Sequence, residues 1–358
     1  MKEIIDQFLY EGDYVHHEPY GFGHINETYL VTCENPKKQY ILQWINPAVF
    51  KRIPELMKNI ELVTDHIKKQ YEREGIEFED RVLRYVPTSE GRSFYKVGED
   101  YYRLYHFVDN STSYEQVPDA RYLELAGEAF GEFQLRLHNF DANLLCETIE
   151  DFHHTPKRYQ RFVEALSDAI PERVMEAKPW IDFIHDHQAM MQKVINGINE
   201  SKIPLRVTHN DTKMNNILFD KNEPKVKCLV DLDTVMPGSL LYDFGDAIRF
   251  GCSTALEDET NLDLIDVNLD YFEAFTKGFI RPLKNTMTDT EFEHLAWSSV
   301  LITCELGMRF LMDYLLGDHY FRIHRPKHNL DRAINQLTLV KRLEEKLPLM
   351  EKIVLKYR

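Results

Sequence analysis

Five polar residues in the middle of the chain have the types and the spacing that chemistry on a phosphate requires. They are His209, Asp211, Lys213, Asn216 and Asp231. A carboxylate can orient and deprotonate a hydroxyl group, and a lysine can neutralise charge on a phosphoryl group in transfer. An amide oxygen and a second carboxylate are hard ligands of the kind that Mg²⁺ prefers. The pattern therefore predicts ATP-dependent phosphoryl transfer, with ATP and Mg²⁺ as cofactors.

The segment between Asn216 and Asp231 indicates how these residues could meet. Two short apolar runs flank a turn at Asn222-Glu-Pro224, which is the pattern of a β-hairpin. Folding back would place Asp231 beside Asn216, so that one divalent ion could touch both. The alternative is an ordinary hairpin with polar turn residues. It gives no reason for a lysine and an asparagine to follow one aspartate at these spacings.

A second acidic segment, Asp243-Phe-Gly245, matches the metal-binding tripeptide of protein kinases. It lies well beyond Asp231 and follows Pro237-Gly238 instead of the hairpin. We therefore assign the metal to Asp231. Asp243 and Asp246 are expected to cap a helix or to support the catalytic loop from behind.

The elements that must position these residues fall into two groups along the chain. Residues 1–110 are expected to form a small, strand-rich, nucleotide-binding lobe, in which Gly21 and Gly23 precede an alternating segment. Glycines at a strand turn let backbone N–H groups approach phosphates, although a tight hairpin is the alternative. Residues 111–358 are expected to form a helical lobe with the catalytic loop. Its helices are expected at 119–138, 268–279, 289–316 and 329–347. The fold class is therefore α+β.

The composition is that of a globular enzyme of a reducing compartment. Of the 358 residues, 43% are hydrophobic and 28% are charged, and the five cysteines form no Cys-x-x-Cys pair. No apolar run approaches the roughly 20 residues of a membrane span. The net charge of −16 argues against nucleic acid or an anionic membrane as a partner. A cytoplasmic location is expected, and the oligomeric state is left open.

The spacing His-x-Asp-x-x-x-x-Asn, followed by Asp-x-Asp after a hairpin, resembles the aminoglycoside phosphotransferase and choline kinase superfamily, a relative of the protein kinases. The resemblance implies a bilobal protein-kinase-like fold with the active site in the cleft between the lobes. It also implies that Asp211 is the catalytic base and that Lys213 contacts the phosphate. Asn216 and Asp231 would hold Mg²⁺, and Asp233 would contact the ion through water. His209 would be structural.

The same resemblance exposes one departure in the nucleotide-binding lobe. Kinase-like folds carry a lysine on the second strand, paired with a helix glutamate, but this chain has Gln43 there. Glu61, on a helix expected at 54–70, would be the acidic partner. Residues 105–108 match the hinge that reads adenine through backbone groups. The expected nucleotide contacts are Gly21, Gly23, His24, Ile25, Asn26, Gln43, Tyr105, His106, Phe107 and Val108.

Longer blocks are similar to the bacterial N-acetylhexosamine 1-kinases, a narrower family. The blocks are residues 23–30, 208–216, 231–239, 250–259 and 307–311. This resemblance implies an amino-sugar substrate that is phosphorylated at its 1-hydroxyl group. The residues expected to contact the sugar are Asp211, Asp233, Phe250, Arg309 and Tyr320.

Three alternatives stay open. A kinase of another small alcohol, such as choline or an aminoglycoside, would use the same motif. A nucleotide-binding pseudokinase is kept in view by Gln43, although the base and metal positions are intact. Arg309 could also form a surface ladder of ion pairs with Glu305 and Asp313, each four residues away on one helix.

Overall fold

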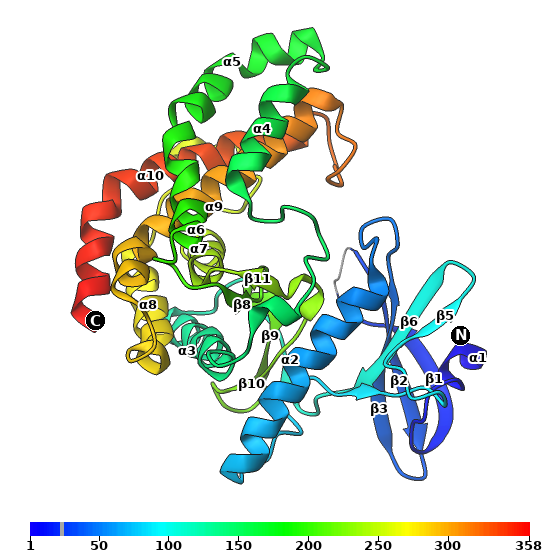
Figure 1. The fold of residues 1–358 in the computed structure, drawn as a ribbon. Helices are drawn as coiled ribbons and strands as arrows, with labels where there is room; N and C mark the ends of the chain where they lie inside the picture. The colour runs from blue at the N-terminus through cyan, green and yellow to red at the C-terminus, as the bar shows by residue number, and fades with distance from the viewer. Residues whose placement is uncertain (22–24) are drawn as a thin grey trace. The chain divides into compact units, whose positions relative to one another are not determined.

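The computed structural model describes residues 1–21 and 25–358. It divides into two compact units, which are described separately below (Figure 1). Unit 1 comprises residues 1–113, 139–150 and 216–236. Unit 2 comprises residues 114–138, 151–215 and 237–358.

Unit 1 is built on an antiparallel sheet with the strand order β1-β2-β3-β6-β4, and β5 pairs with β6. The strands are β1 (Asp13–Pro19), β2 (Glu27–Glu34), β3 (Lys38–Ile45), β4 (Tyr85–Val86), β5 (Tyr95–Val97) and β6 (Asp100–His106). Side chains alternate between the two faces of a strand. Leu42 and Leu104 therefore share one face, where they are buried in an apolar core with Val31 and Tyr40. Gln43 and Arg103 occupy the other face.

Helix α2 (Ile53–Glu74) supplies the long helix of unit 1, and the short helix α1 (Lys2–Ile5) joins the apolar core through Ile5. The apolar positions of α2 recur at helical spacing, and Ile53, Leu56, Met57, Ile60 and Val63 are buried. The helix ends at Gly75, whose positive φ of 68° is a conformation that glycine adopts without strain.

A second, three-stranded sheet of unit 1 has the order β10-β9-β7. Its strands are β7 (Ser111–Thr112), β9 (Ile217–Asp220) and β10 (Val226–Leu229). β9 and β10 pair in antiparallel fashion, so the expected hairpin is confirmed. Two short 3-10 helices complete this unit, η1 (Ala142–Leu144) and η4 (Leu232–Thr234).

Unit 2 is mainly helical. Its helices are α3 (Ala120–Arg136), α4 (Thr155–Ala165), α5 (Pro171–Asp186), α6 (Lys193–Asn199), α7 (Leu240–Gly251), α8 (Leu269–Leu283), α9 (Asp289–Leu316) and α10 (His328–Tyr357). Short 3-10 helices lie at η2 (Gln188–Gln192), η3 (Met214–Asn216) and η5 (Leu262–Leu264). The strands β8 (Arg206–Thr208) and β11 (Met236–Gly238) form a two-stranded sheet.

Local sequence signals set several of these helix boundaries. The side chain of Asp119 accepts hydrogen bonds at the start of α3, as an N-cap should. Thr288 and Glu291 form a capping box at the start of α9. The antiparallel sheet near the N-terminus and the helical remainder confirm the expected α+β class.

One helix among the described residues, α9, is long and apolar enough by length and composition to cross a membrane. Within its most apolar window, 83% of the residues are buried inside the protein, which is typical of a core helix. The sequence is expected to contain no apolar run of such a length. Helix α9 is not recognised as one because Glu305 and Arg309 interrupt its apolar residues.

Candidate active site

The segment that follows strand β8 carries the expected base and phosphate contact, both within unit 2. Lys213 Nζ lies 2.9 Å from Asp211 Oδ1, and the two side chains are 35% and 26% exposed. The carboxylate of Asp211 raises the pKa of Lys213, so the lysine is held in its charged form. A carboxylate and an ammonium group thus lie side by side and are both accessible. Such a pair can accept a proton from a hydroxyl group and can neutralise an anion.

Two buried carboxylates of helix α7 hold this segment in place. Asp243 accepts hydrogen bonds from the backbone N–H groups of His209 and Asn210, at 3.0 and 2.8 Å. Asp246 accepts one from the N–H of Thr212 at 3.0 Å. Burial raises the pKa of Asp243. The two aspartates therefore support the loop from behind, as expected from the sequence.

Packing around the same loop is close. His209 is buried, and its ring makes edge-on contacts with Phe130 and Phe133 of α3. A Cβ atom on Gly238 would lie 2.6 Å from the Thr208 hydroxyl oxygen, so the approach of β11 to β8 requires glycine. These contacts fix the backbone around Asp211.

The expected metal ligands meet in unit 1 through the hairpin. Ile217 of β9 pairs with Leu229 of β10, and the N–H of Val230 donates to the carbonyl of Asn216 at 2.9 Å. Asp231 comes next, in the left-handed conformation (φ 58°, ψ 57°). The backbone thereby brings Asn216 and Asp231 close together. This pair fits Mg²⁺, which proteins bind through one or two carboxylates together with substrate phosphates.

Gln43 is part of a buried polar cluster in unit 1. Its side-chain oxygen accepts from Arg103 Nε and Nη2 at 2.9 and 2.7 Å, and its Nε2 donates to Thr28. Arg103 also forms a two-point ion pair with Asp233. Asn26 Nδ2 donates to the same carboxylate at 2.7 Å. The Asp233 carboxylate is thus fully engaged inside unit 1.

The expected pairing of Gln43 with Glu61 is wrong. Glu61 is exposed on α2, and the side chain of that helix that reaches the cluster is Met57, whose sulfur lies 3.8 Å from Arg103 Nη1. The carboxylate of this cluster is Asp233. Gln43 has no charge to attract a glutamate, whereas the guanidinium of Arg103 does attract a carboxylate.

Two of the other expected nucleotide contacts, Tyr105 and His106, lie on strand β6. The N–H groups of His106 and Phe107 donate to the carbonyls of Arg84 and Gln39, so both N–H groups are already bonded within unit 1. Burial lowers the pKa of His106 to about 4, which keeps the imidazole neutral. Gly23 and His24 lie outside the described residues.

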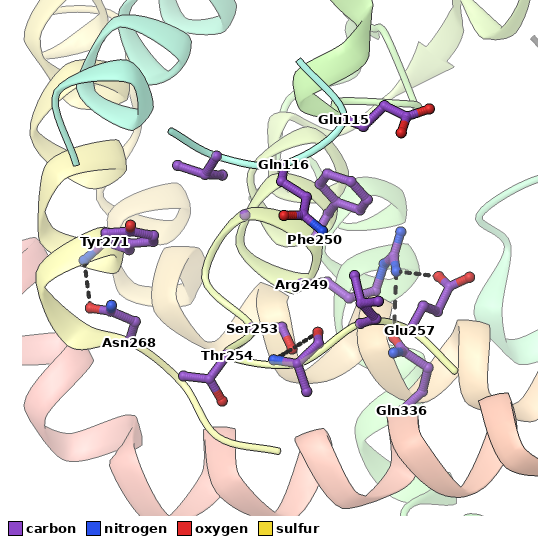
Figure 2. A pocket seen from close by; sticks show the side chains of 14 residues that line it. Glu115, Gln116, Arg249, Phe250, Ser253, Thr254, Glu257, Asn268, Tyr271 and Gln336 are labelled. Atoms are coloured by element: carbon purple, nitrogen blue, oxygen red, sulfur yellow. Dashed lines mark hydrogen bonds and ion pairs between the residues drawn. The ribbon is translucent and has the colours of Figure 1, made fainter. Parts of the chain in front are cut away.

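A pocket of about 460 Å³ lies within unit 2 (Figure 2). Phe250 and Tyr271 supply aromatic rings, and Val117 and Leu256 supply apolar surface, while other lining residues carry amides, hydroxyl groups and charges. The polar lining residues are Glu115, Gln116, Arg249, Ser253, Thr254, Glu257, Asn268 and Gln336. Such a mixture of aromatic faces, amides and hydroxyl groups suits a neutral, hydroxyl-rich ligand.

Arg249 connects this pocket to the loop that carries Asp211. Its guanidinium contacts Asp246 at 2.9 Å and Glu257 at 2.8 Å, as Figure 2 shows for Glu257. Asp246 in turn holds the N–H of Thr212. Among the described lining residues Arg249 is the one cation, and its charge is balanced by two carboxylates.

Arg309 does not form the alternative ladder of ion pairs. Glu305 accepts hydrogen bonds from His153 and Thr155, and Asp313 accepts from the N–H groups of Tyr320 and its neighbours. Both carboxylates are thus used elsewhere. The Arg309 guanidinium instead lies over two aromatic rings, those of Phe152 at 5.5 Å and Phe321 at 5.6 Å.

Arg309 and Tyr320 belong to one group of side chains. Burial, together with the charge of Arg309, lowers the pKa of the nearby Arg158 to about 10, and Tyr320 also interacts electrostatically with Arg158. Asp313 holds the backbone at Tyr320, whose side chain is exposed. The residues that line the pocket of Figure 2 include Phe250 but neither Arg309 nor Tyr320.

Sequence reasoning missed several residues of these clusters. Three of them contact residues that the sequence analysis names. Arg103 contacts Gln43, Arg249 contacts Asp246, and His153 contacts Glu305. The sequence carries one signal: Arg103 is a cation between Tyr102 and Leu104 in an aromatic-rich strand, and a buried arginine is unusual unless its side chain is paired.

Comparisons with known proteins agree with this architecture. A solved aminoglycoside phosphotransferase from Alicyclobacillus acidocaldarius has a TM-score of 0.63 at 12% identity, covering 99% of this chain and 96% of that chain. A microcompartment-associated aminopropanol kinase has a TM-score of 0.61 at 15% identity, and the match covers 98% of this chain and 97% of that chain. A spectinomycin phosphotransferase, solved with ADP and spectinomycin, has a TM-score of 0.57 at 13% identity, and the match covers 93% of this chain and 94% of that chain.

These similarities confirm the kinase-like fold class. The model of the phosphotransferase enzyme family, APH, matches residues 16–276. That match spans the first strands of unit 1, the loop with Asp211, the β9–β10 hairpin and helix α7. The chain belongs to the phosphotransferase enzyme family.

Proposed function

We propose that the protein is an ATP-dependent kinase that phosphorylates the 1-hydroxyl group of N-acetylhexosamines such as N-acetylglucosamine and N-acetylgalactosamine. The observation that carries the kinase assignment is the Asp211–Lys213 pair on a loop whose backbone is held by Asp243 and Asp246. The adjacent pair Asn216 and Asp231 supports use of a nucleotide with its metal.

In the proposed reaction Asp211 orients the acceptor hydroxyl group and takes its proton. The hydroxyl oxygen then forms a bond to the γ-phosphorus of ATP while the bond between that phosphorus and the β–γ bridging oxygen breaks. The products are the sugar 1-phosphate and ADP. Lys213 balances charge on the transferred group. Asn216 and Asp231 would hold Mg²⁺, which neutralises the phosphates when bound.

The lining of the unit 2 pocket supports a sugar as the acceptor. Phe250 and Tyr271 offer faces against which a pyranose ring can pack, and amide and hydroxyl groups can bind its hydroxyl groups. Arg309 and Tyr320, which lie outside the lining of this pocket, are proposed as additional contacts of the acetamido group or a hydroxyl group, because the Arg309 guanidinium has no ion pair among the described residues. Its donors are therefore available to a neutral acceptor.

A second candidate is a kinase of a small amino alcohol. The solved aminopropanol kinase has this fold, and Glu115 and Glu257 line the pocket. A cationic substrate needs carboxylates that are not already paired. Glu257 is paired with Arg249, which leaves Glu115 alone of these two for a cation, and Arg158 and Arg309 add positive charge near Tyr320. The sugar is therefore preferred.

The test measures ADP release with a panel of acceptors. We expect turnover with N-acetylglucosamine and N-acetylgalactosamine, and none with their 1-O-methyl glycosides, in which the reacting hydroxyl group is blocked. Choline, 1-amino-2-propanol and kanamycin serve as the amino-alcohol arm. ³¹P NMR of the product would identify a glycosyl phosphate. Turnover confined to an amino alcohol would overturn the sugar assignment, and ADP binding without turnover of any acceptor would indicate a pseudokinase.

A further inference from the structure

Arg103 is a buried cation at the centre of unit 1. Its side chain is 3% exposed and Asp233 is 2% exposed. The guanidinium bonds both oxygens of Asp233 and also bonds Gln43, which lies directly opposite on the neighbouring strand. Arg103 and Asn26, which both donate to the Asp233 carboxylate, belong to unit 1.

The segments that meet at Arg103 are far apart in the sequence. Asn26 comes immediately before strand β2, and its side-chain oxygen also accepts from the N–H of Asn46 at 3.1 Å. Asp233 lies two residues after Asp231, within the 3-10 helix η4 that Asp231 begins. Arg103 therefore fixes the loop that carries Asp231 to two parts of the nucleotide-binding sheet at once.

The pairing also separates two carboxylates that could compete for one ion. Asp231 and Asp233 are close in sequence, and carboxylate oxygens are ligands of the kind that a divalent cation prefers. A buried carboxylate is tolerated only when it is paired and hydrogen-bonded. The two-point pair with Arg103 satisfies Asp233, whereas Asp231 directly follows Val230, whose N–H bonds the carbonyl of Asn216.

We propose that Arg103 is a positioning residue for metal-dependent nucleotide binding. It holds Asp233 away from the metal and fixes Asp231 in the orientation that binds it. This inference rests on the proposed function, because it assigns Mg²⁺ and a nucleotide to the loop at Asp231.

The experiment measures the Kd of ADP by calorimetry with and without Mg²⁺. In the wild-type protein we expect Mg²⁺ to strengthen ADP binding by at least about tenfold, since Asp231 and the phosphates share the ion. In Arg103→Met we expect the ratio of the two Kd values to fall below about threefold, because the loop is no longer fixed. The KM for the acceptor should stay within about twofold of wild type, since the acceptor pocket lies in unit 2.

Leu104→Ala provides the matched control. Leu104 is the next residue of β6, is fully buried and faces the opposite side of the sheet, in the apolar core. Its truncation lowers Tm through a cavity and leaves the polar cluster intact. We expect Leu104→Ala to lower Tm and to keep the wild-type effect of Mg²⁺. If it instead reduced the Mg²⁺ effect as much as Arg103→Met does, lost stability alone would explain the result and the proposal would fall.

Arg103→Lys keeps the charge and serves if the methionine variant does not fold. One ammonium group cannot make the two-point contact with Asp233 and reach Gln43 as well. We expect an intermediate Mg²⁺ effect, and a wild-type ratio in this variant would overturn the proposal. A wild-type protein whose ADP affinity is indifferent to Mg²⁺ would overturn the proposed function itself. A normal Mg²⁺ effect in Arg103→Met would overturn only the role of Arg103.

Discussion

Three charged side chains of the motif segments are each balanced by an identified partner. Asp211 faces Lys213, Asp233 faces Arg103, and Asp246 faces Arg249. The first pair is accessible, whereas the other two are buried. An accessible pair can exchange its partner for a substrate, and a buried pair holds structure in place. This difference in exposure separates the groups proposed to react from those that position them.

The proposed base gives the first prediction. Asp211→Asn keeps the shape of the side chain but removes the proton acceptor, so kcat should fall by roughly 10²–10⁴-fold. The Kd for ADP should stay within about threefold of wild type, because the proposed nucleotide contacts lie elsewhere. Asp263→Asn, an exposed aspartate on unit 2, is the control and should leave kcat unchanged. An Asp211→Asn variant with more than about a tenth of the wild-type rate would remove Asp211 from the role of base.

Arg309 gives the second prediction. Arg309→Ala should raise the KM for N-acetylglucosamine by at least about tenfold, since a guanidinium that lacks an ion pair is available to the acceptor. The Kd for ADP should not change. Arg332→Ala is matched to it, because Arg332 also lies over an aromatic ring, that of Phe310 at 5.4 Å. Equal effects of the two substitutions on KM, or a fall in Tm with no effect on KM, would make Arg309 a packing residue.

At the scale of elements, the parts that the sequence predicts well are those set by local patterns. The hairpin of β9 and β10 has two apolar runs around a turn, and α9 has a capping box at Thr288 and glycine at its C-terminus. The expected bounds of helix α9 are accordingly the observed ones. Asp243 lies on helix α7, beyond the hairpin in the sequence, and it supports the loop as expected.

What the sequence could not predict depends on register between distant strands. Arg103 meets Gln43 only because β3 and β6 pair in one particular register, and a shift of one residue would turn Arg103 to the opposite face. Glu61 is suggested as the partner only by the resemblance to kinase-like folds, in which a glutamate of the accompanying helix pairs with the strand lysine. The pairing of Arg103 with Asp233 spans 130 positions, and no local pattern encodes it.

The contact between helices α3 and α8 gives the third prediction. A Cβ atom on Gly127 would lie 2.2 Å from the carbonyl oxygen of Phe275, and one on Gly278 would lie 2.0 Å from that of Glu124. Each Gly→Ala change should therefore lower the free energy of unfolding by about 1–3 kcal/mol, measured in urea. The double variant should lose less free energy of unfolding than the two single variants lose together, because one separation of the helices relieves both close contacts.

Gly251→Ala is the control for this pair. Its Cβ would meet only the Cδ2 atom of Leu123, at 2.9 Å, and the end of a leucine side chain can move. Alanine also favours the helix more than glycine does. We expect the change at Gly251 to alter the free energy of unfolding by less than about 1 kcal/mol. A cost at Gly127 as small as that at Gly251 would show that the helices adjust without strain.

At the scale of the whole molecule, unit 1 is assembled from three separate stretches of the chain. Residues 1–113 supply the large sheet, and residues 139–150 and 216–236 supply the rest. The added stretches provide polar partners inside the unit. Asn59, which is buried on α2, donates to the carbonyls of Cys146 and Val235 at 2.7 and 3.0 Å. The sequence boundary expected near residue 110 marks the end of the first stretch only.

The fourth prediction follows from this assembly of unit 1 out of three stretches and concerns a fragment of residues 1–113. Without the other two stretches, Arg103 loses Asp233 and Asn59 loses both carbonyl partners, so the fragment would bury an unpaired cation and an unsatisfied amide. Breaking a buried ion pair costs about 3–5 kcal/mol, and an unsatisfied polar group about 1–3 kcal/mol. A domain typically has only about 5–15 kcal/mol of stability, so the fragment should show no cooperative urea transition by circular dichroism.

Replacing both groups in the fragment, as Arg103→Met with Asn59→Leu, should restore part of the transition, because apolar side chains need no partner. A cooperative transition in the unmodified fragment would show that the first stretch folds without the carboxylate and carbonyl groups that the later stretches supply.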